Sequence, residues 1–182
     1  MKRLIPGTNE SLPAVGVGTW QTFDVAPEGF DPLRDVLKTL LAEGGTVIDS
    51  SPMYGKSEEV VGTLSTELKL NDKLFIATKV WTSGQQNGIN QMNESFEKLR
   101  RKQIDLMQIH NLVDWQIHLK TLSRWKAEGR IRYIGLTQYT DDAHDTLLEI
   151  IRKNRVDFIQ VNYNLLDRNA EQALLPVPKI ST

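Results

Sequence analysis

The stretch TVIDSSPMYGKSEEVVGTLSTELKLNDKLFIATKV (46–80) contains the unit that decides the fold. Residues 46–50 and 74–80 are short apolar runs rich in β-branched side chains, which is typical of buried strands. Residues 57–69 between them have the apolar spacing of a helix, and Ser57 stands where an N-cap residue is expected. A strand, a helix and a second strand predict two parallel strands joined by a right-handed crossover.

The same unit recurs along the chain. Further strands are expected at 15–20, 104–110, 131–137 and 158–163, and further helices at 31–45, 89–101, 115–129 and 144–154. The strands that start at 46, 74, 104, 131 and 158 follow one another every 27 to 30 residues. Before them, RLIPGTNESLPAV (3–15) predicts a small hairpin whose turn lies in PGTNES (6–11).

Two α/β architectures are compatible with such repeats, an open doubly wound sheet and the (β/α)8 TIM-type barrel. The regular period favours the barrel, and GVGTW (16–20) lacks the G-x-G-x-x-G turn of the dinucleotide-binding open sheet. Only six strands are visible, whereas a closed barrel has eight and takes about 250 residues. We therefore expect one domain over residues 1–182 with an incomplete barrel of about six strands and five to six helices, preceded by an N-terminal β-hairpin.

The composition excludes several classes of function and of site. The formal net charge is -1, which argues against a nucleic-acid binder or a polybasic membrane binder. The chain has no cysteine, so disulfides, thiolate metal sites and cysteine nucleophiles are excluded. Neither a signal peptide nor a membrane span is visible, and we expect a cytoplasmic protein whose partner is a small molecule.

Polar side chains follow the carboxyl ends of consecutive expected strands. By strand alternation, Asp49 shares a face with Val47, Lys79 with Phe75 and Ala77, and His110 with Gln108 and Leu106. In barrels of parallel strands the chemistry lies at the carboxyl ends. Asp49, Lys79 and His110 are therefore expected around one opening, with Tyr54 in the loop beside them.

Each of these residues also has an ordinary structural interpretation. Lys79 would extend to solvent, His110 would pack, Asp49 would cap a turn and Tyr54 would be a loop aromatic. His118 and His144 are expected on the surface of helices. The convergence of four ionisable groups from three neighbouring strand ends favours a site over these separate roles.

The four groups suggest one reaction. A phenol titrates near 10, and a nearby ammonium lowers that value, so Lys79 would make Tyr54 a better proton donor. Asp49 would keep Lys79 charged, and His110 would direct a substrate carbonyl toward Tyr54. Because no side chain donates hydride, a cofactor must supply it. A weaker alternative makes Lys79 a Schiff-base nucleophile.

The chain resembles the aldo-keto reductases from the hairpin to about residue 175. The motifs that carry the resemblance are GVGTW (16–20), VIDSSPMYG (47–55), IATKVW (76–81), DLMQIHN (105–111), GLTQY (135–139) and FIQVNYN (158–164). It implies reduction of aldehydes or ketones with NADPH, and it puts Asp49, Tyr54, Lys79 and His110 on the family's catalytic tetrad.

The resemblance also implies a cofactor site. Thr137, Gln138 and Gln160 would hold the nicotinamide carboxamide, and Asn111 would lie beside the ring. A second group, Gly18, Thr19 and Trp20, would line the pocket. Gln138 departs from the pattern, since Asn or His is more usual there.

The family pattern stops near the C-terminus of this sequence. NAEQALL (169–175) predicts the start of a sixth helix, with Asn169 as N-cap and Gln172 in a capping box, and Pro176 and Pro178 interrupt it. We expect a truncated family member that binds NADPH weakly and turns over little. Its uncovered sheet edges would favour self-association. The alternative is a non-catalytic remnant or partner-binding module.

Overall fold

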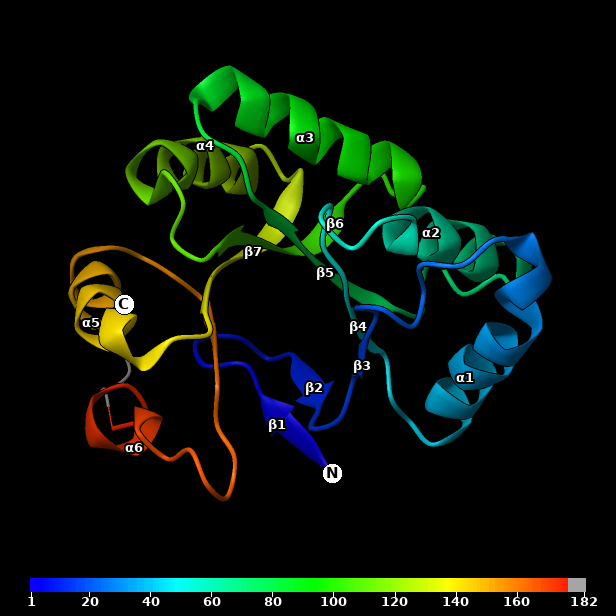
Figure 1. Cartoon of the computed structure of the whole chain (residues 1–182), viewed down its shortest axis with the longest axis horizontal. Coiled ribbons are helices and arrows are strands. Elements are labelled where there is room, and N and C mark those ends of the chain that lie inside the picture. Colours follow the sequence, from blue (N-terminus) through cyan, green and yellow to red (C-terminus); the bar gives the residue numbers. More distant parts are fainter. Residues whose placement is uncertain (177–182) are drawn as a thin grey trace.

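The computed structural model describes residues 1–176, and its centre is one curled parallel sheet of six strands (Figure 1). The strands are β3 (Val17–Gly18), β4 (Val47–Asp49), β5 (Phe75–Val80), β6 (Ile104–His110), β7 (Ile131–Gln138) and β8 (Phe158–Val161). Their spatial order follows the chain order without a reversal. A doubly wound sheet would reverse its order at a switch point, so the barrel prediction is confirmed in the form of a half-barrel.

Helices follow the strands and lie on the outer side of the curled sheet, as Figure 1 shows. The α-helices are α1 (Phe30–Ala42), α2 (Ser57–Glu67), α3 (Gln85–Lys98), α4 (Trp115–Ala127), α5 (His144–Lys153) and α6 (Ala170–Ala173). Two short 3₁₀ helices, η1 (Pro27–Gly29) and η2 (Asp141–Ala143), precede α1 and α5. Within residues 1–176, no helix combines the length and apolarity that crossing a bilayer requires.

Strand alternation gives the sheet two apolar clusters, one on each side. Side chains such as Ile76, Met107 and Ile109 pack outward in the large core beneath the helices. Phe75, Ala77, Leu106 and Tyr133 form a separate cluster on the inner, concave side. The inner cluster is the floor above which the polar strand ends are placed.

The N-terminal hairpin consists of β1 (Lys2–Leu4) and β2 (Ser11–Pro13), with the turn where the sequence predicted it. Ile5 is buried in the inner cluster, and Leu12 packs against it. Glu10 accepts hydrogen bonds from the hydroxyl of Tyr133, at 2.7 Å, and from the Arg132 guanidinium. The hairpin therefore covers the end of the sheet where the strands begin.

Several local predictions were wrong. The first expected strand, 15–20, is reduced to Val17–Gly18. Ser57 is the first residue of α2 rather than its N-cap, and its hydroxyl donates to the Thr19 carbonyl oxygen at 3.3 Å. Asn169 is the N-cap residue of α6, as predicted, but its side chain makes no capping hydrogen bond; its amide nitrogen donates to Asp141. Pro178 lies outside the described residues.

The prediction that His118 and His144 are surface residues was also wrong, because both are buried. His118 bonds through Nε2 to the Thr82 carbonyl oxygen at 2.7 Å. A Cβ atom at Gly88 of α3 would approach the His118 ring to 2.4 Å, so the glycine makes room for the imidazole. The two histidines therefore belong to the packing of α4 and α5.

Candidate active site

Four of the predicted site residues meet at the carboxyl end of the sheet. Asp49 ends β4, Lys79 is the penultimate residue of β5, and His110 ends β6. Tyr54 lies in the short loop between β4 and α2, in which its amide donates to the Ser51 carbonyl oxygen at 3.0 Å. Parallel pairing of β4, β5 and β6 brings these positions together, because the carboxyl ends of parallel strands share one edge.

Lys79 and Asp49 form a buried ion pair. The ammonium Nζ donates to Asp49 Oδ2 at 2.8 Å and to the Ser50 carbonyl oxygen at 2.7 Å. Lys79 is only 1% exposed, so it does not extend to solvent as an ordinary strand-end lysine would. Burial lowers the pKa of Lys79, and the neighbouring Asp49 carboxylate opposes that change.

The Tyr54 phenol has a pKa raised above its usual value, first by burial and then by the negative charge of Asp49. This contradicts the expectation that Lys79 would lower it. The Lys79 ammonium lies 5.1 Å from the centre of the Tyr54 ring, in a cation–π position. The short hydrogen bonds of the Lys79 ammonium go to Asp49 and Ser50. Tyr54 is therefore protonated at neutral pH, as a proton donor must be.

His110 is neutral at physiological pH. Burial and the Lys79 charge lower its pKa to about 4, and Asp49 opposes this only in part. Its ring centre lies 6.4 Å from that of Tyr54, in an edge-to-face arrangement, and its buried Nδ1 has no hydrogen-bond partner among the described residues. A neutral imidazole beside a phenol can offer one N–H to a polar ligand atom.

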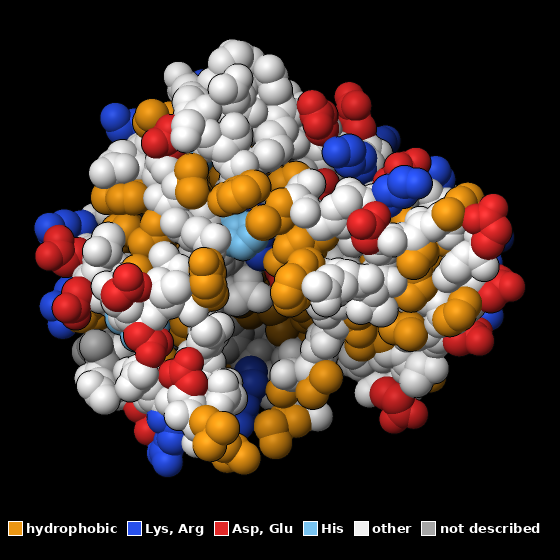
Figure 2. Space-filling model, viewed as in Figure 1, with side chains coloured by type: hydrophobic (Ala, Val, Ile, Leu, Met, Phe, Trp, Pro, Cys, Tyr) orange, Lys and Arg blue, Asp and Glu red, His pale blue; other side chains and the backbone are white. Residues whose placement is uncertain are grey.

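The opening at the carboxyl end of the sheet, called the mouth below, is hollow and largely apolar at its rim. Figure 2 shows a depression near the centre of one face, with a histidine side chain at its edge and hydrophobic side chains around it. Large side chains left exposed at these strand and loop ends are Trp20, Met53, Trp81 and Tyr139. The Trp81 ring centre lies 6.3 Å from that of His110. The surroundings suit a small organic molecule better than a polyanion.

The residues expected to hold the nicotinamide carboxamide lie along the far side of this mouth. Thr137 is paired with His110 on one side and with Gln160 on the other. Gln160 is exposed, and its amide nitrogen donates to Asp49 Oδ2 at 3.3 Å. The Gln138 side-chain oxygen accepts hydrogen bonds from the backbone amides of Tyr139, at 2.8 Å, and Thr140, at 3.2 Å.

Asn111 and the residues at the end of β3, Gly18, Thr19 and Trp20, complete the predicted set, and Thr19 differs from the prediction. The Asn111 backbone N–H donates to Thr137 Oγ1 at 3.3 Å, and Asn111 has a left-handed backbone conformation, with φ 52°. Trp20 is 64% exposed at the rim, and Gly18 pairs with Asp49. Thr19 is fully buried and donates to Ser50 Oγ at 2.9 Å, so it supports the mouth from below and does not line it.

Sequence reasoning missed two buried residues that contact this site. Gln108 of β6 donates from Nε2 to Asp49 Oδ1 at 3.1 Å, and only its shared face with His110 hinted at this. Glu58 of α2 accepts from Thr78 Oγ1 at 2.6 Å and from Ser95 Oγ at 3.1 Å. Burial raises the pKa of Glu58, whereas the two hydroxyl donors lower it. Glu58 thereby ties the helix that follows Tyr54 to the strand that carries Lys79.

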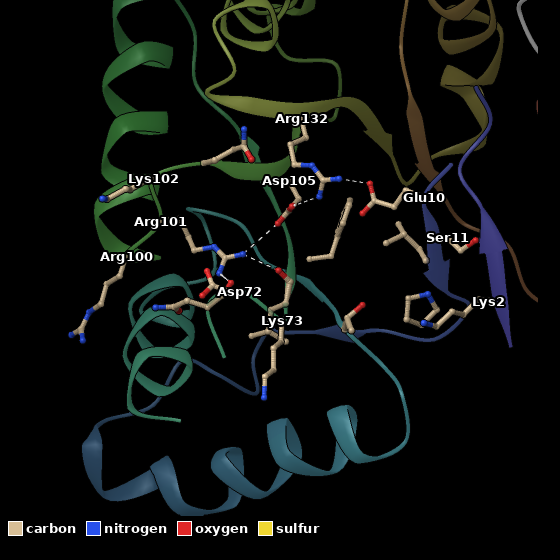
Figure 3. A pocket seen from close by; sticks show the side chains of 17 residues that line it. Lys2, Glu10, Ser11, Asp72, Lys73, Arg100, Arg101, Lys102, Asp105 and Arg132 are labelled. Atoms are coloured by element: carbon tan, nitrogen blue, oxygen red, sulfur yellow. Dashed lines mark hydrogen bonds and ion pairs between the residues drawn. The ribbon is translucent and has the colours of Figure 1, made fainter. Parts of the chain in front are cut away.

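A second cavity, of about 710 Å³, lies at the opposite end of the sheet (Figure 3). Its lining has more cationic side chains (Lys2, Lys73, Arg100, Arg101, Lys102 and Arg132) than anionic ones (Glu10, Asp72 and Asp105), but two of the arginines are paired with carboxylates. Arg132 bonds to Asp105 at 2.7 Å and also to Glu10, and Arg101 contacts Asp105 at 3.4 Å. Figure 3 shows Lys73 and Arg100 directed away from this network. The cavity therefore resembles a structural seam between the hairpin and the strand starts.

A curled parallel sheet with an Asp–Tyr–Lys–His cluster at its carboxyl end defines a protein of the (β/α) barrel type. The sequence profile of the Aldo/keto reductase family matches residues 14–179. The chain belongs to this family. It is 28% identical to aldo-keto reductase YhdN of Bacillus subtilis over 96% of its length, and 31% identical to methylglyoxal reductase YeaE of Escherichia coli over 91%.

Solved structures of aldo-keto reductases have a similar fold. A putative aldo-keto reductase from Pseudomonas aeruginosa matches with a TM-score of 0.80 and 25% identity, over 94% of this chain and 70% of that one. An aldo-keto reductase from Klebsiella pneumoniae, solved with NADP and acetate, matches with a TM-score of 0.77 and 27% identity, over 91% of this chain and 60% of that one. The chain spans 57% of the length of YhdN and 60% of that of YeaE.

Proposed function

We propose that this chain takes part in the reduction of an aldehyde or ketone to an alcohol with NADPH. The observation that carries the proposal is the convergence of Asp49, Tyr54, Lys79 and His110 on one hollow. Lys79 Nζ is 2.8 Å from Asp49 Oδ2 and 5.1 Å from the Tyr54 ring centre, and the Tyr54 and His110 rings are neighbours. This set supplies proton donation and carbonyl orientation without a further protein group.

Each residue then has a distinct role. The protonated Tyr54 hydroxyl donates its proton to the carbonyl oxygen as negative charge develops there. The neutral His110 donates a hydrogen bond to the same oxygen and orients it. The Lys79 ammonium, held by Asp49, stabilises the phenolate that Tyr54 becomes. The carbon–oxygen double bond gains one hydride at carbon and one proton at oxygen, so the product is the alcohol.

The residues at the far side of the mouth fit a nicotinamide carboxamide. Gln160 and Gln138 carry side-chain amides, and two amides can form complementary hydrogen bonds with each other. When bound, NADPH supplies the hydride. The Klebsiella relative was solved with NADP, and this chain is expected to take the same class of cofactor at Asn111, Thr137, Gln138 and Gln160.

A turnover assay tests the proposal. Methylglyoxal is the chosen probe, because YeaE is a methylglyoxal reductase, and the loss of NADPH absorbance is followed with NADH in parallel. The Tyr54→Phe variant is expected to lower kcat by about 10² to 10⁴-fold with an unchanged circular dichroism spectrum. Tyr163→Phe is the matched control, since its hydroxyl bonds to Glu171 away from the cluster.

Two other outcomes would point elsewhere. If the wild-type chain neither binds NADPH in a fluorescence titration nor consumes it, the non-catalytic, partner-binding alternative is supported. Trapping of a substrate adduct on Lys79 by borohydride would support the Schiff-base alternative. The burial of Lys79 and its bonds to Asp49 and Ser50 weigh against that chemistry, because a nucleophilic amine must reach the substrate.

A further inference from the structure

We propose that Gln108 is a positioning residue, which fixes the Asp49 carboxylate so that Asp49 presents one oxygen to Lys79. This inference rests on the proposed function, and it adds a residue that lies beneath the four groups at the mouth. Gln108 belongs to the same strand as His110 and lies two residues before it.

The hydrogen bonds around Asp49 leave its carboxylate little freedom. Gln108 Nε2 donates to Oδ1 at 3.1 Å, and Lys79 Nζ donates to Oδ2 at 2.8 Å. Gln160 Nε2 also donates to Oδ2, at 3.3 Å. With a separate donor on each oxygen, rotation of the carboxylate would break at least one of these bonds. The Gln108 contact therefore determines which oxygen Lys79 receives.

Gln108 is itself held in place. It is 2% exposed, and it pairs in register with Lys79 on one side and Gly135 on the other. A Cβ atom at Gly135 would approach Gln108 Cγ to 2.8 Å and Leu106 Cδ1 to 3.2 Å. The missing side chain at Gly135 thus gives the long amide the space it occupies on the inner side of the sheet.

The chemistry of an amide suits this position. A small cavity of about 180 Å³ borders Asp49, Gln108 and Gln160 and is otherwise lined mainly by apolar side chains such as Phe75 and Phe158. A cation at residue 108 would compete with Lys79 for Asp49, and an anion would repel Asp49. A neutral donor stabilises the carboxylate and leaves the charge balance of the ion pair unchanged.

Three variants test the inference in the full chain. Gln108→Met keeps the length of the side chain and removes the donor. Gln108→Glu has a donor only when its carboxyl group is protonated. Gly135→Ala leaves Gln108 intact but crowds it. Gln103→Met is the control, because Gln103 bonds to the Gly129 carbonyl oxygen at the opposite end of the sheet.

The readouts are kcat, KM for methylglyoxal and for NADPH, and the pH profile of kcat. Gln108→Met and Gly135→Ala are expected to lower kcat about 10-fold with both KM values within about twofold of wild type, because an orienting partner of a site residue typically contributes this much. Gln108→Glu should be impaired at pH 8 and recover as the pH is lowered to 5.5, relative to Gln108→Met at each pH. Loss of packing alone would not produce that recovery.

The outcomes separate this inference from the proposed function. If the wild type is active and Gln108→Met retains its kcat, or if Gln108→Glu and Gln108→Met have parallel pH profiles, the positioning role is overturned and the reductase function stands. If the wild type is inactive, both are overturned. Should Gln108→Met fail to fold by circular dichroism, Gln108→Glu and Gly135→Ala decide the question by the same criteria.

Discussion

The buried ion pair between Asp49 and Lys79 gives a prediction that does not depend on activity. Charges 2.8 Å apart attract by about 6 kcal/mol at an effective dielectric constant near 20. Desolvation of each ion offsets several kcal/mol of this. We expect Asp49→Asn to lower the free energy of unfolding by about 3 kcal/mol, because it leaves a buried ammonium without its anion, and Lys79→Met to lower it by about 2 kcal/mol.

The double variant Asp49→Asn/Lys79→Met is expected to lose only about 2 kcal/mol, since no uncompensated charge remains. The double-mutant cycle then gives a coupling free energy of about 3 kcal/mol. Urea denaturation at pH 7, followed by circular dichroism, measures all four proteins. The exposed pair Lys38–Asp35 serves as the control and should show a coupling near zero. Additive effects at Asp49 and Lys79 would refute the reasoning.

Three further predictions concern pH and association. Glu58→Gln should gain stability relative to wild type as the pH rises above 4.5, because the pKa of Glu58 is raised in the folded state and wild type therefore loses stability when Glu58 ionises. Urea midpoints measured across this pH range test the prediction, and parallel curves for the two proteins would contradict it. His110→Gln should lose less stability than wild type as the pH falls from 7 to 4. The pKa of His110 is about 4, against 6.5 for an ordinary histidine. At about 1.36 kcal/mol per pKa unit, and halved because the side chain is partly exposed, this difference corresponds to a stability loss in wild type of about 1.7 kcal/mol. The outer strands β3 and β8 each pair on one side only within residues 1–176, and Leu165 and Leu166 are almost fully exposed. We therefore expect concentration-dependent self-association in light scattering, and a monodisperse monomer would speak against it.

The repeat and the strand faces could be predicted because they depend on short-range pattern. A strand in a curled parallel sheet buries both faces, and the residues that alternate with Lys79 and His110 identify the inner side. The same alternation places Asp49, Lys79 and His110 at one edge. The distances between these three side chains follow from the pairing of the strands and need no separate signal in the sequence.

Features that depend on three-dimensional packing could not be predicted. His118 has the helical position of a surface residue, and its burial follows from Gly88 on a different helix. The pKa of Tyr54 rises because of burial and the negative charge of Asp49, both of which depend on the packing around the phenol. The bond from Gln108 to Asp49 spans 59 positions, and alternation suggested only that both face inward.

The N-terminal hairpin has a consequence for the order of folding. Each strand–helix–strand unit closes contacts over about thirty residues, whereas Glu10 reaches Arg132 and Tyr133 across more than 120 positions. Closing so long a loop costs more chain entropy than closing a single repeat. The hairpin is thus among the last elements to find its partners, and until Tyr133 is available the inner apolar cluster stays uncovered at the end where the strands begin.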